Sequence, residues 1–173
     1  MWHRRRFLLL TGALALSVAG ALPSSAADGL APPRGEIVLT VTGVIGKTTT
    51  PGRAEFDLEA LERLGLGKLS TWTPWTDGEI AFEGVLARRL MEAVEARGTE
   101  VHAVALNHYE FTIPLEDFEK YDVMLATRSN GRPMQVRDKG PVWIVYPWSD
   151  HPELDDFATR EKSVWQLSTL HVR

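Results

Sequence analysis

The sequence predicts a single α+β domain with a mixed, mostly antiparallel sheet and a few short helices. Short runs of β-branched and aromatic residues outnumber helical patterns over residues 36–173, and turn dipeptides such as Asn130-Gly131 follow several of these runs. No internal repeat or linker divides this range. Several short strands with a few short helices between them are typical of α+β domains.

Residues 1–27 precede this domain and have the three parts of a secretory signal peptide. Three arginines are followed by an apolar run over residues 7–22 and by small residues that end at Ala27. The apolar run is shorter than the roughly 20 residues of a membrane-spanning helix. We therefore expect cleavage after Ala27, no stable membrane anchor, and a periplasmic or secreted protein. Arg4-Arg5 followed by Phe7-Leu8 also fits a twin-arginine signal, so the export route stays open.

Residues 28–173 carry a formal net charge of −7, because all 23 acidic residues but only 16 of the 19 Lys and Arg residues lie there. This balance argues against nucleic acid and anionic lipid as partners. The chain has no cysteine, which excludes disulfides, thiolate metal ligands and a cysteine nucleophile. A small molecule or another exported protein is the partner class that fits.

Local patterns predict the elements of the first half. Residues 28–35 form a flexible Pro/Gly-rich lead-in, and the β-branched residues 36–42 predict a strand. Asp57 can cap a helix over residues 58–64, whose leucines recur on one face. Residues 69–76 alternate polar and bulky side chains, and a proline inside this run favours an edge strand.

The middle of the chain alternates between helix and strand patterns. An apolar stripe predicts a helix over residues 86–96, ended by an Arg-Gly pair. Residues 100–106 and 111–113 predict two strands joined by a turn at residues 107–109. One or two helical turns follow over residues 114–119, with proline at the start, where its missing N–H costs little.

The last third is predicted to be mainly strand. Residues 122–127 form a buried strand that turns back at Asn130-Gly131. The run 142–146, bounded by prolines, is apolar throughout and predicts a strand buried on both faces. Residues 149–160 predict an acidic loop or short helix, and residues 164–172 a final strand with its tryptophan and leucines inward.

No pattern predicts a catalytic or metal-ligating group. His102 and His108 lie six residues apart across a strand and a turn, which is not the helical i, i+4 spacing of a two-histidine metal site. The acidic residues 150–156 lack the alternating oxygens and central glycine of a calcium loop. No serine lies in a nucleophile-elbow pattern.

A set of landmarks occurs in a characteristic order along the chain. They are Phe82-x-Gly84-Val85-Leu86, Ala105-Leu106-Asn107-x-Tyr109, Ile113-Pro114-Leu115, Asn130-Gly131-x-Pro133-Met134 and Gly140-Pro141-Val142. Together they resemble the oxidoreductase molybdopterin-binding domain of the sulfite-oxidase family over residues 36–173. The resemblance implies that family's fold and a molybdopterin cofactor whose molybdenum is bound by a cysteine thiolate.

The chain departs from the family at the metal ligand. The resemblance places Thr71 nearest the family's cysteine, and a neutral hydroxyl cannot replace a soft thiolate on a high-valent metal. Trp143 or Ile144 stands where the family has an arginine. Two functions stay open: an exported, non-redox module that binds a ligand or partner, and a molybdenum-cofactor oxidoreductase with atypical metal ligation. Enzymatic activity and the identity of any cofactor are undecided.

Aromatic and polar residues would line the cleft that such a domain uses for its cofactor. Aromatic walls with a few convergent polar groups are typical of small-ligand pockets. Edge packing and a partner surface are the alternatives for Trp72 and Trp75, whereas core packing explains Trp143 and Trp165. The candidate cofactor-binding residues are Thr71, Trp72, Trp75, Asn107, His108, Tyr109, Arg128 and Arg132.

Overall fold

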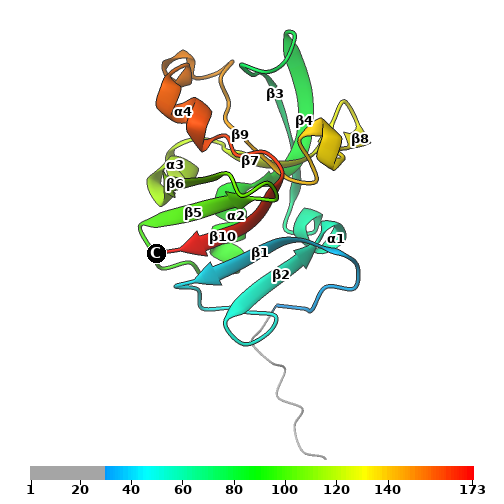
Figure 1. Ribbon diagram of the computed structural model, residues 1–173, viewed down its shortest axis with the longest axis vertical. Helices are drawn as coiled ribbons and strands as arrows, with labels where there is room; N and C mark the ends of the chain where they lie inside the picture. The colour runs from blue at the N-terminus through cyan, green and yellow to red at the C-terminus, as the bar shows by residue number, and fades with distance from the viewer. Residues whose placement is uncertain (1–29) are drawn as a thin grey trace, which may run out of the picture.

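Ten strands form two sheets in the computed structural model, which describes residues 30–173 (Figure 1). The strands are β1 (Ile37–Gly43), β2 (Arg53–Asp57), β3 (Leu66–Trp72), β4 (Glu79–Leu86), β5 (Glu100–Ala105), β6 (Glu110–Pro114), β7 (Met124–Ser129), β8 (Arg132–Pro133), β9 (Trp143–Val145) and β10 (Leu167–Val172). The helices are α1 (Leu58–Glu62), α2 (Ala87–Ala93), α3 (Leu115–Lys120) and α4 (Phe157–Lys162), with 3-10 turns η1 (Val136–Asp138) and η2 (Pro152–Leu154). The predicted signal peptide lies outside the described residues, and none of the described helices is long and apolar enough to cross a membrane.

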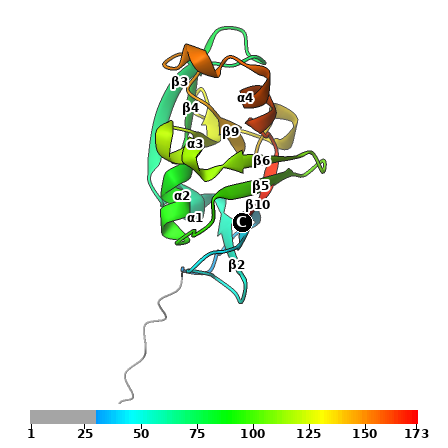
Figure 2. The same ribbon diagram turned by 90° about the vertical axis from the view of Figure 1, so that its left-hand side faces the viewer.

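The first sheet has the strand order β2-β1-β10-β5-β6. β1 and β10 run parallel, and the other neighbours are antiparallel. Leu39, Val41, Ala103 and Leu170 have no exposed surface and form its core face. Figure 2 shows α1, α2 and α3 on one side of this sheet. The mixed, mostly antiparallel α+β class predicted from the sequence is confirmed, with two sheets rather than one.

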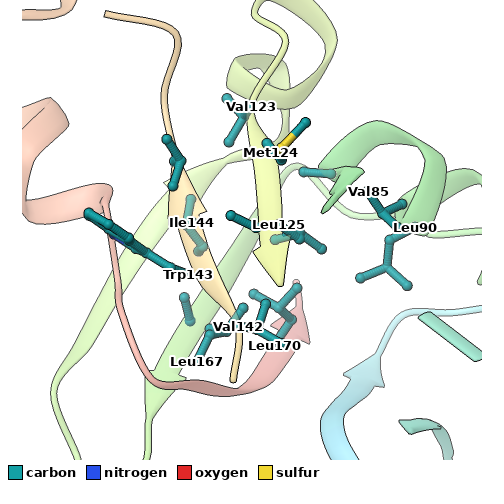
Figure 3. Packing of buried hydrophobic residues seen from close by; sticks show 14 of the residues in the cluster. Val85, Leu90, Val123, Met124, Leu125, Val142, Trp143, Ile144, Leu167 and Leu170 are labelled. Atoms are coloured by element: carbon teal, nitrogen blue, oxygen red, sulfur yellow. The ribbon is translucent and has the colours of Figure 1, made fainter. Parts of the chain in front are cut away.

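The second sheet has the order β3-β4-β7-β8, and β9 also pairs with β7. Leu125 of β7 lies opposite Ile144 of β9 in antiparallel register (Figure 3). On its other side, Ile144 donates its N–H to the carbonyl of Val164 at 3.0 Å. All residues from Val142 to Trp148 are buried. The prediction of a strand buried on both faces is confirmed, although the strand is only three residues long.

Two glycine-containing landmarks have clear structural roles. Asn130 and Gly131 both have positive φ, 49° and 76°, and form the predicted turn between β7 and β8. Gly84 lies beside an irregularity in the β4–β7 pairing, where a Cβ atom would come within 2.1 Å of the Leu125 carbonyl oxygen. A side chain at this position would therefore force β4 and β7 apart.

Several predicted boundaries differ from the observed ones. β2 was not predicted, and β4 is a full strand where the sequence indicated only the approach to a helix. α2 is shorter than predicted, and Trp165 lies before the start of β10 rather than inside it. Asp57 does cap α1, because its carboxylate accepts the N–H of Ala60 at 2.6 Å.

Candidate ligand-binding site

Thr71, which the sequence resemblance places nearest the family's cysteine, is closed off from solvent. It lies near the end of the edge strand β3 and has no exposed surface. Its hydroxyl oxygen accepts the backbone N–H of Ser149 at 2.9 Å and donates to the carbonyl of Trp72 at 3.0 Å. The backbone N–H of Trp72 in turn donates to the Ser149 hydroxyl at 3.2 Å. Thr71 and Trp72 therefore tie β3 to the segment after β9, and the Thr71 hydroxyl does not face a cavity.

Arg128, a second predicted site residue, forms a two-point ion pair with Glu62 of α1. Its Nε and Nη2 atoms lie 2.9 and 2.8 Å from the two carboxylate oxygens, and the Thr127 hydroxyl donates to the same carboxylate at 2.8 Å. The hydrogen bond from Arg128 holds the pKa of Glu62 below its ordinary value, against the opposing effect of burial. The charge of Arg128 is therefore neutralised within the fold, as in other paired guanidinium–carboxylate contacts.

Arg132 lies beside a different hollow of the surface. This hollow, about 830 Å³, is lined only by residues between Ser129 and Asp138, which form the β7–β8 turn and η1. His108 occupies the β5–β6 turn with a φ of 66° and is exposed, and its N–H donates to the carbonyl of Ala105. Neither side chain joins the other predicted site residues.

Trp75 is the centre of a cluster that contains all five tryptophans of residues 30–173. Its ring centroid lies 5.2 Å from that of Trp165, 6.0 Å from Trp143 and 6.1 Å from Trp148, each in an edge-to-face arrangement. Trp72 joins through Trp148 at 6.3 Å. Edge-to-face contacts are the favoured geometry for aromatic pairs, so these rings fix one another's orientation.

A cavity of about 190 Å³ lies beside this cluster. The β5–β6 hairpin supplies one wall and the segment from α4 to β10 another. Its lining residues are Trp75, Asn107, Tyr109, Arg160, Glu161, Ser163, Val164 and Trp165. The structure thus brings together three predicted site residues, Trp75, Asn107 and Tyr109, and leaves the other five outside.

The C-terminal half of the lining was not predicted. Trp165 was assigned to the core, yet it is only half-buried and lines the cavity. Glu161 lies just after residues 149–160, the predicted acidic loop or short helix, and was assigned to no element. Only the partial exposure of these side chains distinguishes them from their neighbours, and this exposure has no local sequence signal.

Tyr109 and Glu161 are coupled across the mouth of the cavity. The Tyr109 hydroxyl lies 2.9 Å from the Glu161 carboxylate and 3.0 Å from the Glu161 carbonyl oxygen. Burial and this hydrogen bond raise the pKa of Tyr109 to about 12, so it remains a protonated donor at neutral pH. Arg160 pairs with Asp155 at 2.6 Å. No lysine or arginine of residues 30–173 forms an ion pair with Glu161.

The residues present do not fit the molybdopterin group that the sequence resemblance implies. Within the described residues, no three His, Asp or Glu side chains are grouped as a metal site would require. No buried side-chain nitrogen or oxygen there lacks a hydrogen-bond partner, so none is left for a missing group. The cavity is also smaller than the roughly 300 Å³ at which pockets for drug-sized ligands begin.

Known proteins with the same fold were found by comparison of the sequence and of the structure. A family model described as the oxidoreductase molybdopterin binding domain matches residues 52–149, which are 98 of the 173 residues. The crystal structure of the sulfane dehydrogenase SoxCD from Paracoccus pantotrophus is similar, with a TM-score of 0.58 and 19% identity. The alignment covers 78% of this chain but only 37% of that chain, and at this identity it shows a shared fold alone. No curated protein matches the chain.

Proposed function

Because the chain belongs to the oxidoreductase molybdopterin binding domain family, we propose that it is a non-redox member that binds a small molecule. The observation that carries this proposal is the state of Thr71, which is fully buried and hydrogen-bonded to Ser149. Molybdenum of the family's type needs a soft thiolate at that position. A buried, uncharged hydroxyl that is already hydrogen-bonded within the protein has neither the negative charge of a thiolate nor a surface that the metal could reach.

The pairing of Arg128 with Glu62 supports the same proposal. A pterin phosphate needs cationic or N–H donors, and Arg128 already directs two of its donors to Glu62. Releasing Arg128 would leave the Glu62 carboxylate, whose side chain is 15% exposed, without its charged partner. Arg128 therefore serves to hold α1 against β7.

Export is part of this proposal. The basic, apolar and small-residue segments of residues 1–27 support a cleaved signal peptide. The mature protein would then be periplasmic or secreted. Its fold would rest on core packing without disulfides, since the chain has no cysteine.

The cavity beside Trp75 is the place we propose for the ligand. It combines aromatic walls with a few polar groups, which is the composition of small-molecule sites. Its volume of about 190 Å³ suits a ligand smaller than a typical drug. Another exported protein is the alternative partner, and it would contact the exposed side chains around the cavity mouth instead of filling it.

A thermal-stability screen against small metabolites tests the proposal. Tyr109→Leu alters the cavity wall, and Phe157→Leu makes a similar change at an α4 residue that is 78% exposed and does not line the cavity. We expect at least one compound to raise the Tm of the wild type and Phe157→Leu but not of Tyr109→Leu. The proposal would be contradicted if every stabilising compound raised the Tm of both variants equally. It would also be contradicted if no compound raised the Tm of the wild type. Stoichiometric molybdenum and pterin would favour the oxidoreductase alternative.

A further inference from the structure

The walls of the cavity meet at a right angle. The indole rings of Trp75 and Trp165 lie 5.2 Å apart with an angle of 83° between their planes, and Tyr109 lines the same space. The faces of aromatic rings carry negative electrostatic potential and attract cations. Two perpendicular indoles with a phenol form the kind of aromatic box that recognises quaternary ammonium groups.

The charges around the cavity also favour a cation. Arg160 and Asp155 form an ion pair and cancel one another. Glu161 carries a carboxylate that meets only the neutral hydroxyl of Tyr109 and has no basic partner in the ion pairs of residues 30–173. The lining itself holds one positive and one negative side chain, Arg160 and Glu161. Because Arg160 is paired with Asp155 outside the lining, the Glu161 carboxylate is the charge that remains to face a cationic ligand.

A cation is already bound to the same tryptophan within the protein. The ammonium of Lys139 lies 5.3 Å from the Trp165 ring centroid and 5.7 Å from that of Trp143. Lys139 is not among the residues that line the cavity. The Lys139 contact shows that Trp165 is placed to interact with positive charge.

The hydrogen bonds of the lining discriminate between kinds of cation. A primary ammonium needs acceptors for three N–H donors. The Ser163 hydroxyl is already used, since it donates to the Ile144 carbonyl and accepts from the Trp143 indole at 3.2 Å. The Glu161 carboxylate already accepts from Tyr109. A fully methylated ammonium donates no hydrogen bond and needs none of these acceptors, whereas a primary ammonium depends on the acceptor sites that Glu161 still offers.

The walls are held in place before any ligand arrives. The backbone N–H of Tyr109 donates to the Asn107 side chain at 3.0 Å, and its hydroxyl is fixed by Glu161. The backbone N–H of Trp75 donates to the Thr73 hydroxyl at 3.2 Å, which fixes the turn that carries the indole. Walls that are already ordered reduce the entropic cost of binding.

We infer that this cavity binds a small quaternary ammonium compound between Trp75, Trp165 and Tyr109, with Glu161 as the opposing charge. This rests on the proposed function, since it names the ligand class of the same site. Five of the eight lining residues, Glu161 and Trp165 among them, lie beyond the segment matched by the family model. The match to the family model therefore does not by itself imply the part of the site that Glu161 and Trp165 form.

Titration with choline and with its neutral isostere 3,3-dimethylbutan-1-ol tests the inference. Tryptophan fluorescence and calorimetry both report binding, because the probe would contact two indoles. We expect choline to bind at least about tenfold more tightly than the alcohol, since only the cation gains the ring and carboxylate attraction. Equal affinity for the two compounds, or no binding of choline, would overturn the inference.

Three variants localise the effect. Tyr109→Leu and Glu161→Gln should each weaken choline binding by about three- to thirtyfold, whereas Glu116→Gln, an exposed carboxylate on α3 outside the lining, should not. Circular dichroism shows whether each variant is folded. Choline affinity that is unchanged in both Tyr109→Leu and Glu161→Gln would refute the site.

Two further measurements separate the remaining outcomes. Cosedimentation with phosphatidylcholine vesicles, compared with phosphatidylglycerol vesicles, distinguishes a lipid headgroup from a free solute, and binding to either choline source supports the inference. If choline fails while another small molecule stabilises the protein in a Tyr109-dependent way, the ligand class is wrong but the proposed function stands. If no small molecule stabilises the protein in a Tyr109-dependent way, both the ligand class and the proposed function are wrong.

Discussion

Ser149 donates its backbone N–H to the hydroxyl oxygen of Thr71 at 2.9 Å, across 78 residues of sequence. The backbone N–H of Trp72, the residue after Thr71, donates in turn to the Ser149 hydroxyl at 3.2 Å. This reciprocal pair locks the end of β3 to the segment that follows β9. The position that the sequence resemblance places nearest the family's cysteine is thus a structural contact between two parts of the fold.

Removing the Thr71 hydroxyl should destabilise the protein. Thr71→Val keeps the shape of the side chain but leaves the Ser149 N–H without its acceptor, so we expect a loss of about 1–3 kcal/mol in the free energy of unfolding. Urea denaturation measures this loss. Ser70→Ala removes the neighbouring, exposed hydroxyl and should change stability by less than about 0.5 kcal/mol. Equal effects of the two substitutions would show that the Thr71 contact is unimportant.

Glu62→Gln should destabilise the protein in a pH-dependent manner. The pKa of Glu62 is lowered in the folded state from 4.5, mainly by Arg128, so the unfolded chain binds the proton more readily. The Glu62 carboxylate therefore contributes its full stabilisation of the folded state above pH 4.5. This stabilisation is lost as the pH falls through the lower pKa that Glu62 has in the folded protein. We expect Glu62→Gln to cost about 1–3 kcal/mol at pH 7.

Urea denaturation of wild type and Glu62→Gln at a series of pH values measures this dependence. The difference between the two proteins should shrink steadily below pH 4.5. Glu59→Gln, at a neighbouring α1 residue whose side chain is 79% exposed, is the matched control and should change stability little at any pH. A Glu62 difference that stays constant down to pH 2 would show that the ion pair does not contribute in this way.

The parts of the fold that could be predicted are those with a strong local pattern. The apolar run around Ile144, the Asn130-Gly131 turn and the Asp57 cap each depend on a few adjacent residues, and each is present. β2 was not predicted, because three of its five residues are charged and Asp and Glu are depleted in strands, although the run alternates polar and apolar side chains. Its strand conformation comes from pairing with β1.

The site was predicted only in part for a related reason. Trp75, Asn107 and Tyr109 do line one cavity, but Thr71 and Arg128 are occupied by Ser149 and Glu62. Those partners lie 78 and 66 residues away in sequence. Whether a polar side chain is free or already paired depends on such long-range contacts, and no local pattern encodes them.

Export should remove the first 27 residues. When the full chain is expressed with its own leader, we expect periplasmic protein whose intact mass corresponds to a chain that begins at Asp28. Arg4→Lys combined with Arg5→Lys distinguishes the route, because a twin-arginine signal needs both arginines and a general secretory signal needs only positive charge. Protein that stays in the cytoplasm with residues 1–27 attached would contradict the predicted signal peptide.

The molybdenum and pterin content of the protein is the most direct test of a non-redox role. The full chain is expressed in molybdate-replete cells and purified by a mild procedure, in parallel with a cysteine-containing member of the same family as the positive control. Elemental analysis gives molybdenum per chain, and fluorescence of the oxidised pterin gives the organic part. We expect full loading of the control and only traces in this protein, since Thr71 offers no thiolate and is buried. One molybdenum and one pterin per chain would contradict the proposal.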